Sequence, residues 1–371
     1  MEFTVNIEDN NYPYFLTEDY SDVRSKLNCF EYDKLFFIYD SNISSEEIGH
    51  LRKQFESTIS YFTELDVLEE MKRLSYVESL VDTLMELGIS RQSIIIPVGG
   101  GVLGNIVGLA SSILFRGIRF VHIPTTVMAA ADSVLSLKQA VNTSYSKNLL
   151  GSYHCPECVI VNYRLFKSLP DRDYKSGLAE TVKNILAISP SSFEKFSEFF
   201  CTGIRRTRDE LYFVIKQSIE VKNSVLKNDK FERKEGLILE YGHTIGHAYE
   251  ILNNGKLRHG EAVAFGLLVA CEISYSLGFL SDESVSKHYE MVEMIDVLSE
   301  IDINDFDKTD EIWEQILLDN KRGYRPLRAD EAGVILLSAL GDPHIDSSNI
   351  VSPITQVTLL DAIDKTLKKI H

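Results

Sequence analysis

Cysteine is scarce in this sequence, and its placement does not suggest a disulfide framework. The five cysteines, an odd number, are scattered through 371 residues, which suits a reducing compartment. Cys155 and Cys158 form one C-x-x-C pair, but there is no second pair to complete a structural zinc site. A strand-like run follows the pair, where a redox motif would open a helix. A chemical role for this pair is therefore the less favoured interpretation.

Long apolar runs are also missing. No uninterrupted apolar stretch has the length needed to cross a bilayer. The amino-terminal segment MEFTVNIEDNNYPYF is acidic and lacks the basic segment followed by an apolar one that marks a secretory signal. We therefore expect a cytoplasmic protein with no membrane partner.

Positive charge is in deficit. Lysine and arginine total 38 against 55 aspartates and glutamates, which gives a formal net charge of −17. Such a charge repels polyanions at long range and argues against binding to nucleic acid or to an anionic membrane. A small anionic substrate is not excluded, but it would need a local basic cluster.

The apolar residues are arranged in two successive patterns. From residue 34 to 126, strand-like runs alternate with amphipathic helical stretches, which predicts parallel βαβ units. Helical periodicity dominates from 171 to about 299, and a strand signal returns in GVILLSAL at 333–340. We predict an α/β fold with two domains: a doubly wound, Rossmann-like nucleotide-binding domain over 1–165 and a mainly α-helical metal- and substrate-binding domain over 166–371.

A glycine turn connects a buried-type strand to a helix in SIIIPVGGGVLGN, residues 93–105. Glycine allows close backbone approach to a ligand, and the helix amino terminus offers free N–H groups to an anion, which predicts a pyrophosphate site. The pattern is GGGxxG rather than GxGxxG, so a tight structural turn is the alternative. Asp40, at the end of FFIYDSN, is placed to accept hydrogen bonds from an adenosine ribose.

Histidines concentrate in LEYGHTIGHAYE, residues 239–250. His243 and His247 are four apart, so on a helix both rings project from one face, and a metal or an ordinary core pair would explain them. His259 opens a further apolar helix, and Glu180 lies mid-helix with Lys183 nearby. One carboxylate and two histidines with open positions are typical of a catalytic divalent site for Zn²⁺ or Co²⁺. Spacing alone does not choose which two histidines bind.

Six motifs together resemble a known family, the sugar phosphate cyclases, whose best known member is 3-dehydroquinate synthase. In chain order they are GGGVLGN, IPTTVMAAADSVLSLKQAVN, KNLLG, GLAETVKN, EYGHTIGHAYE and HGEAVAFG. The resemblance extends from about residue 35 to 325 and is strongest to the 2-deoxy-scyllo-inosose synthases. It implies an NAD- and metal-dependent carbon–oxygen lyase that eliminates phosphate, acting as a homodimer.

The resemblance also assigns roles to individual residues. The implied metal ligands are Glu180, His243 and His259, with His247 in the second sphere or acting as acid or base. The implied nucleotide positions are Asp40, Asn42, Glu69, Lys72, Gly99, Gly100, Gly101, Asn105, Thr125, Thr126 and Lys147. The implied substrate positions are Arg116, Asp132, Lys138, Asn148, Lys183, Lys222, Glu240, His247 and Lys321, with Arg116 reaching a phosphate across the dimer interface. Lys138, Lys183, Glu240 and His247 are the implied catalytic residues. The lysines supply the basic cluster that a small anionic substrate requires.

Departures from 3-dehydroquinate synthase indicate the substrate. Gly236 stands at the position of that enzyme's carboxylate-binding arginine, and Glu240 at the position of an asparagine. A glutamate without the arginine would repel a carboxylated substrate, whereas it can accept hydrogen bonds from the hydroxyls of glucose 6-phosphate. The segment SLKQAVN and Asn105 likewise resemble the inosose synthases. The alternative is that Arg233 or Lys234 replaces the missing arginine.

The activity implied is conversion of glucose 6-phosphate to 2-deoxy-scyllo-inosose and phosphate, a step of aminoglycoside antibiotic biosynthesis. It would proceed by transient oxidation at C4, phosphate elimination, re-reduction and intramolecular aldol closure. The rivals are 3-dehydroquinate synthase, a cyclase for a seven-carbon sugar phosphate, and a metal-dependent polyol dehydrogenase. A catalytically silent subunit is disfavoured by the intact metal set. The native metal and any accessory subunit stay open.

Overall fold

The computed structural model describes residues 1–145, 147–302, 306, 309–319 and 323–370. The chain divides into two compact units: the first comprises Met1–Pro170 and Arg206–Ile215, and the second comprises Asp171–Arg205 and Lys216–His371. The chain thus returns to the first unit over residues 206–215, a feature that the predicted domain boundary at residue 165 did not include. The return is held by side chains: the Tyr212 hydroxyl donates to the Thr17 carbonyl oxygen, and Arg208 pairs with Glu18. Helical periodicity carries no information on such long-range contacts.

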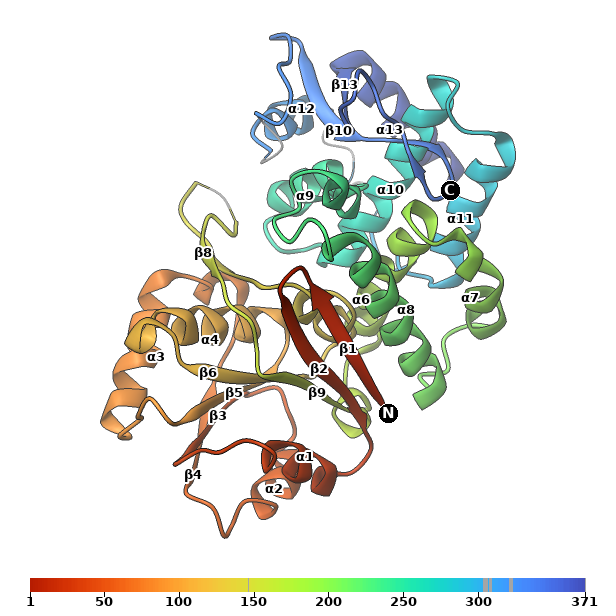
Figure 1. Ribbon diagram of the computed structural model, residues 1–371. Helices are drawn as coiled ribbons and strands as arrows, with labels where there is room; N and C mark the ends of the chain where they lie inside the picture. Colours follow the sequence, from red (N-terminus) through yellow and green to blue (C-terminus); the bar gives the residue numbers. More distant parts are fainter. Residues whose placement is uncertain (146, 303–305, 307–308, 320–322, 371) are drawn as a thin grey trace. The chain divides into compact units, whose positions relative to one another are not determined.

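A seven-stranded sheet forms the centre of the first unit (Figure 1). Its order is β1-β2-β9-β6-β5-β3-β4, and neighbours run parallel except for the β1/β2 hairpin. The strands are β1 (Glu2–Ile7), β2 (Asn10–Thr17), β3 (Leu35–Asp40), β4 (Ser60–Leu65), β5 (Ile94–Gly99), β6 (Arg119–Pro124) and β9 (Cys158–Asn162). The predicted α/β class with a parallel sheet is confirmed, whereas the amino-terminal hairpin was not predicted.

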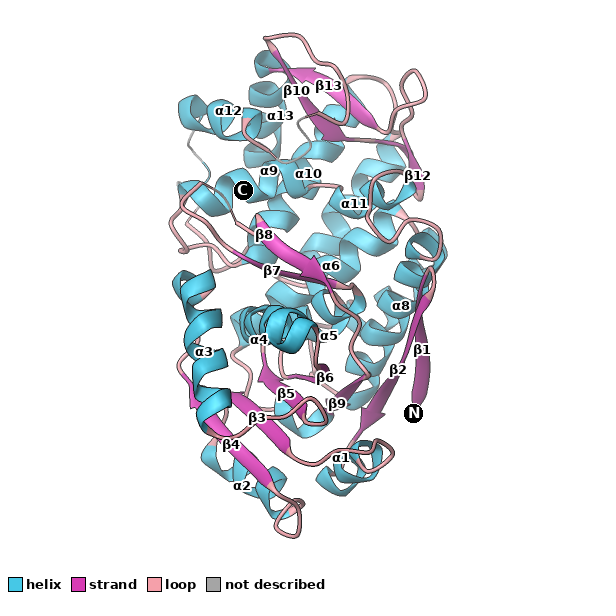
Figure 2. Ribbon diagram, turned by 60° about the vertical axis from the view of Figure 1, so that its left-hand side comes forward, coloured by secondary structure: helices cyan, strands magenta, loops and turns pink. Residues whose placement is uncertain are grey.

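Helices cover both faces of this sheet, as Figure 2 shows for α4 on one side and α1 and α2 on the other. Alternating residues of β3 explain why: Phe36 and Ile38 join the core under α3 and α4, while Phe37 packs on Phe55 near α2, with ring centroids 5.0 Å apart. The helices are α1 (Tyr20–Leu27), α2 (Ser45–Lys53), α3 (Leu74–Glu86), α4 (Gly101–Ile113) and α5 (Val127–Ala131). A sheet buried on both faces accounts for the near-continuous apolar runs of its strands.

The strand order reverses between β3 and β5, because the chain leaves β3 for β4 at the edge and then returns to β5 on the other side. Ligands of open α/β sheets bind beyond the carboxyl ends of the strands at such a point. Here those ends carry Asp40 and Gly99, which follow the paired residues Tyr39 and Val98. A small antiparallel hairpin, β7 (Lys138–Val141) and β8 (Leu150–Tyr153), completes this unit.

Helices dominate the second unit, and α10 lies at its centre. Nearly every residue of α10 is buried, since its run EAVAFGLLVACEI offers no polar face, and α6, α9, α11 and α13 pack around it. The helices are α6 (Asp171–Ala187), α7 (Phe193–Phe200), α9 (His243–Leu252), α10 (His259–Ser276), α11 (Asp282–Met294), α12 (Thr309–Leu317) and α13 (Gln356–Lys369), with α8 (Arg208–Leu226) belonging partly to each unit. Within the described part of the chain, no helix combines the length and apolar composition that a membrane span requires.

Short strands and one notable 3₁₀ helix complete the second unit. The strands are β10 (Glu331–Ile335), β11 (Leu337–Ala339), β12 (Asp342–Pro343) and β13 (Val351–Thr355), which pair as β10/β13 and β11/β12. The strand signal at 333–340 therefore covers parts of β10 and β11. The 3₁₀ helix Glu235–Glu240 leads directly into α9 and its histidines.

Candidate active site

Three helices of the second unit bring four predicted site residues together. Glu180 comes from α6, His243 and His247 from α9, and His259 from α10. One ring nitrogen from each histidine lies within 4.8 Å of the others, and Glu180 Oε1 lies 3.3 Å from His243 Nε2 and 3.5 Å from His259 Nε2. These distances are short enough for a single ion to contact the carboxylate and two or three of the rings.

The ring orientations direct Nε2 of two histidines at Glu180. His243 Nδ1 lies 3.3 Å from the Tyr241 carbonyl oxygen, and His259 Nδ1 lies 3.2 Å from Glu250 Oε2. A carbonyl or carboxylate oxygen requires an N–H donor, so each Nδ1 carries its proton and each Nε2 is left to face the cluster. This is the arrangement by which outer-shell acceptors orient metal-binding histidines.

The cluster requires positive charge at its centre. Glu180 Oε1 is buried and faces Nε2 of His243 and of His259 at 3.3 and 3.5 Å, in neither case with the geometry of a hydrogen bond. Burial alone would lower the pKa of His259, but Glu180 and Glu250 outweigh it and raise that pKa to about 10, so the ring holds a proton when no other cation is bound. A divalent metal would replace that proton and satisfy the carboxylate oxygen. The residues present therefore fit a metal ion.

Glycines explain how α9 and α10 come close enough to form the cluster. Gly242 and Gly246 each precede a histidine, and a Cβ at these positions would lie 2.8 Å from the Leu267 nitrogen and 2.9 Å from the Ala262 oxygen, respectively. Gly242 also has φ +77°, a left-handed conformation that favours glycine. In each Gly-His pair, the glycine is therefore required by the close packing of α9 on α10, while the histidine contributes to the cluster.

Lys183 supports Glu180 from the same helix. Its Nζ lies 2.5 Å from Glu180 Oε2, and both side chains are almost fully buried. Burial by itself would raise the pKa of the Glu180 carboxyl, but Lys183 and then His243 hold it well below its usual range. The carboxylate therefore stays ionised and available to a cation. Lys222, on α8, is also buried.

The segment before α9 leaves little space around Gly236. Asp229 Oδ2 accepts hydrogen bonds from the backbone nitrogens of Lys234 and Gly236 at 2.7 and 2.9 Å, and Oδ1 accepts one from Arg233 at 3.0 Å. A Cβ on Gly236 would lie 2.9 Å from Asp229 Oδ2, so a larger residue does not fit without displacing this carboxylate. Arg233 and Lys234 are exposed, and the Arg233 guanidinium lies over the ring of Phe231.

In the first unit, the glycine turn lies against the predicted nucleotide residues. A Cβ on Gly99 would lie 3.3 Å from the Asp40 Cβ, and one on Gly100 would lie 3.3 Å from Thr126 Cγ2. The Thr125 nitrogen donates to the Gly99 oxygen. Helix α4 begins at Gly101, directly after this turn, so its first backbone N–H groups point toward the turn, as an anion site requires.

Two further nucleotide predictions lie beside this turn. Asn42 donates both its backbone and its side-chain N–H to Asp40 Oδ1 at 2.9 Å. The Asn105 side chain forms two hydrogen bonds with the backbone: its amide donates to the Gly101 oxygen, and its carbonyl oxygen accepts from the Ala140 nitrogen. Asn105 thereby ties α4 to β7, which is a structural task in addition to the predicted cofactor contact.

A polar cluster at the β7–β8 hairpin joins four predicted residues. Lys72 Nζ donates to Asn148 Oδ1 at 2.6 Å, and Lys147 Nζ lies 4.0 Å from Glu69 Oε1. Asn142, which the sequence reasoning did not select, connects them: its amide donates to Glu69 Oε1 and its carbonyl accepts from the Asn148 nitrogen. The only sequence signal for this role was its place at the end of the SLKQAVN motif.

The remaining predicted residues are dispersed. Asp132 follows α5 and Lys138 begins β7, both half-buried, while Arg116 is exposed with a φ of +67°. Lys321 lies outside the described residues.

The family follows from comparison with known proteins. Residues 63–176 match the family model described as 3-dehydroquinate synthase N-terminal, and residues 177–322 match 3-dehydroquinate synthase C-terminal. The chain belongs to the 3-dehydroquinate synthase family. Within it, the chain is 38% identical to 2-deoxy-scyllo-inosose synthase of Micromonospora echinospora over 352 residues, which cover 92% of this chain and 86% of that protein. It is 36% identical to the enzyme of the same name from Niallia circulans, with 91% of each chain covered.

Solved structures of this family share the fold. A crystal structure of 2-deoxy-scyllo-inosose synthase complexed with carbaglucose-6-phosphate, NAD⁺ and Co²⁺ matches with a TM-score of 0.90 at 34% identity, covering 98% of this chain and all of that one. A 2-epi-5-epi-valiolone synthase from Streptomyces hygroscopicus with NAD⁺ and Zn²⁺ bound has a TM-score of 0.84 at 20% identity, covering 96% and 97%. The latter likeness concerns the fold alone.

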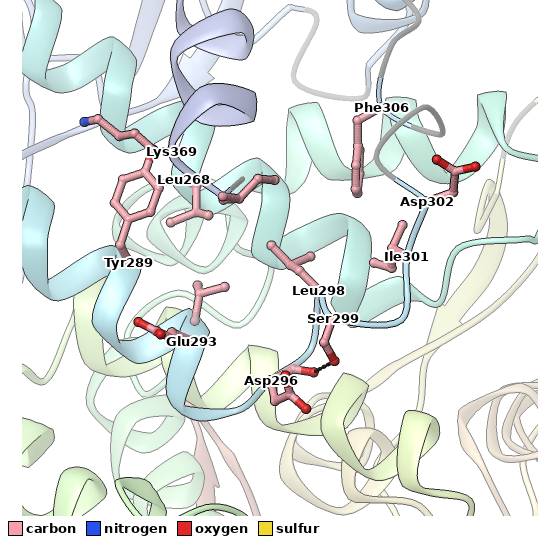
Figure 3. A pocket seen from close by; sticks show the side chains of 12 residues that line it. Leu268, Tyr289, Glu293, Asp296, Leu298, Ser299, Ile301, Asp302, Phe306 and Lys369 are labelled. Carbon is pink, nitrogen blue, oxygen red and sulfur yellow. Dashed lines mark hydrogen bonds between the residues drawn. The ribbon is translucent and has the colours of Figure 1, made fainter.

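One large cavity of the second unit is lined by none of the predicted site residues that the structure describes. It has a volume of about 700 Å³ and is lined by α10, α11, the segment after α11 and the end of α13 (Figure 3). Leu268 and Phe306 form part of its apolar wall, and Glu293, Asp296 and Asp302 are acidic groups around it. None of its described lining residues is a predicted site residue, so cavity size does not locate the chemistry of this chain.

Proposed function

We propose that the protein is a 2-deoxy-scyllo-inosose synthase, which converts glucose 6-phosphate to 2-deoxy-scyllo-inosose and inorganic phosphate. The observation that carries the choice of substrate is the segment before His243. Glu240 stands three residues before this histidine, and a Cβ on Gly236 would crowd Asp229 Oδ2, which accepts a hydrogen bond from the Gly236 nitrogen. A site of this composition suits hydroxyl groups better than a carboxylate. The similarity to enzymes of that name supports the same assignment.

The chain's own residues fit NAD and one divalent metal. Glu180, His243 and His259 would hold the metal, Zn²⁺ or Co²⁺, and the glycine turn with Asp40 would hold the nucleotide. When bound, NAD⁺ would accept and return the C4 hydride while the metal polarises the C4 hydroxyl, so that the reaction is redox-neutral overall. The product is therefore formed without net NADH.

His247 is suited to move a proton. Burial, followed by the neighbouring His243, lowers the pKa of His247 to about 4, so its ring is neutral near pH 7 and offers a nitrogen lone pair, although a pKa this low makes it a weak base. The reaction requires a base, because the C5 proton must leave when phosphate departs from C6. Glu240 would orient the sugar by accepting hydrogen bonds from its hydroxyls.

The phosphate end of the substrate would be held by cations. Lys138, Lys183, Lys222 and Lys321 are the proposed contributors, with Asp132 and Asn148 on the sugar. Holding the whole molecule while its ring opens keeps the C1 aldehyde near the C6 enolate, which favours intramolecular aldol closure through effective concentration.

Phosphate release provides the direct test. Glucose 6-phosphate with NAD⁺ and Co²⁺ or Zn²⁺ should give inorganic phosphate and a carbocyclic ketone, with no lasting NADH absorbance. The substrate of 3-dehydroquinate synthase, assayed in parallel, should give none. Release from the carboxylated substrate alone would contradict the proposal and indicate that another cation replaces the missing arginine. Net NADH without phosphate would indicate a polyol dehydrogenase.

We also propose a cytoplasmic homodimer with no nucleic-acid or membrane partner. The net charge of −17 opposes polyanion binding, and Arg116 is exposed, as a residue that reaches the substrate of a partner subunit must be.

A further inference from the structure

Tyr241 lies between two residues of the proposed site and is itself completely buried. It follows Glu240 at the end of the 3₁₀ helix and precedes Gly242, the residue before His243. Its hydroxyl lies 2.9 Å from Nε2 of His288, a buried histidine of α11 that belongs to none of the predicted site sets. This contact joins the start of α9 to a helix distant in sequence.

The direction of the contact follows from the second nitrogen of the ring. His288 Nδ1 lies 2.7 Å from the Ser284 carbonyl oxygen, which can only accept, so Nδ1 carries a proton. The neutral ring then offers Nε2 as an acceptor, and the Tyr241 hydroxyl donates to it. The two rings meet edge to face, with an interplanar angle of 74°, so both geometry and proton position are defined.

The main chain of Tyr241 is in turn tied to the metal centre. Its carbonyl oxygen accepts from His243 Nδ1 at 3.3 Å, the contact that directs His243 Nε2 toward Glu180. The next residue, Gly242, has a flexible backbone and φ +77°, and no side chain caps the amino terminus of α9. The backbone of residues 240–243 is not stiffened by a helix cap. The buried Tyr241 side chain therefore anchors this segment.

We infer that Tyr241 and His288 are positioning residues, which hold the His243 ring toward the metal and Glu240 toward the substrate. The inference rests on the proposed function, because it requires that His243 binds a metal. An outer partner of a metal-bound histidine changes metal affinity by roughly 10- to 100-fold. Loss of this anchor should therefore be visible in metal binding, before any measurement of turnover.

Tyr241→Phe tests the inference with the ring retained and only the hydroxyl removed. The matched control is Tyr289→Phe, one residue along α11, which removes a hydroxyl that donates to the buried Glu272 at 2.8 Å and lies outside the proposed site. The measurements are Co²⁺ affinity by titration of the metal-free full-length protein, the visible spectrum of the Co²⁺ form and the melting temperature. We expect Tyr241→Phe to weaken Co²⁺ binding by about tenfold or more and to alter the spectrum, and Tyr289→Phe to lower only the melting temperature.

A double variant separates positioning from simple stability. Tyr241→Phe with His288→Leu removes both partners, which leaves no buried polar group unpaired and should restore much of the melting temperature. We expect Co²⁺ affinity to stay low. Recovery of affinity together with stability would overturn the inference, as would wild-type affinity in Tyr241→Phe. If the wild-type protein itself binds neither Co²⁺ nor Zn²⁺, the proposed metal site is wrong. This outcome differs from the ones that would reject only the positioning role of Tyr241 and His288.

Discussion

At the scale of single residues, the chemistry concentrates on Glu180, whose environment differs sharply from that of an ordinary helical carboxylate. It pairs with Lys183 three residues on, and both side chains are nearly inaccessible to water. Lys195 and Glu198 form an ion pair with the same spacing on α7, at 2.6 Å, but both are exposed. The same local spacing thus gives a buried pair beside the histidine cluster at one position and a solvated pair at the other.

This contrast yields a prediction. Glu180→Gln should abolish tight binding of Co²⁺ or Zn²⁺ and lower the free energy of unfolding by about 3–5 kcal/mol, because Lys183 is left as a buried charge without its partner. Glu198→Gln, the control, should change stability by less than about 1 kcal/mol. Metal content by elemental analysis and chemical denaturation measure the two effects. Stoichiometric metal in Glu180→Gln would contradict the ligand assignment.

A second residue prediction concerns substrate choice. Glu240→Gln should reduce kcat/KM for glucose 6-phosphate by roughly 10- to 150-fold, since a hydrogen bond to a charged group is worth about 1.5–3 kcal/mol. Glu235→Gln alters an exposed glutamate of the same 3₁₀ helix and should leave the kinetics unchanged. Equal kcat/KM for Glu240→Gln and the wild type would remove the basis for the substrate assignment.

Replacing Gly236 by arginine is a poor test of specificity. The site of its Cβ lies 2.9 Å from Asp229 Oδ2, so the substitution would break the hydrogen bonds that shape the segment before α9. A loss of activity in that variant would report misfolding as readily as altered recognition.

At the scale of elements, the proposed metal site depends on how closely α6, α9 and α10 approach. Gly260 is the second residue of α10, directly after His259, and a Cβ there would lie 1.8 Å from the Ser176 backbone oxygen of α6. The Gly260 nitrogen donates to the Ser176 hydroxyl at 3.0 Å. This close approach places His259 beside Glu180.

Gly260→Ala should therefore separate α10 from α6. We expect a loss of about 1–3 kcal/mol in the free energy of unfolding, typical of an overpacked core, together with weaker metal binding. Gly49→Ala is the control, because nothing lies within 4 Å of a Cβ at this position in α2. It should be neutral or stabilising by about 1 kcal/mol. Wild-type stability and metal affinity in Gly260→Ala would show that the helices adjust freely.

At the scale of the whole molecule, the proposed homodimer can be tested through Arg116. If Arg116 acts on the substrate of the partner subunit, Arg116→Ala and Lys222→Ala homodimers should each be nearly inactive. Subunit exchange between the two should restore up to about a quarter of the activity in the mixture, because half of the chains form heterodimers and each of these has one intact site. Light scattering of the separate variants checks that both remain dimers. No recovery after demonstrated exchange would contradict an Arg116 contribution across the interface.

Much of the fold could be predicted from local pattern. The alternation of runs over 34–126 predicted β3 through β6 with their helices, and the fold class is confirmed by the parallel sheet. The motifs likewise selected Glu180, His243 and His259, whose ligand atoms the structure brings together. Their roles remain predictions. The fold prediction succeeded because helical spacing and strand alternation are short-range properties of the residue order. The choice of Glu180, His243 and His259 came instead from the resemblance of their motifs to a known family.

Other features depended on contacts that no local pattern records. The pairing of β2 with β9, the return of 206–215 to the first unit, the link made by Asn142 and the contact between Tyr241 and His288 all join residues far apart in the chain. By itself, the sequence determined the class of fold, the family and the candidate ligands. Only the tertiary structure decided which nitrogen of each histidine faces Glu180, because that choice depends on the acceptor that packing places beside the other nitrogen.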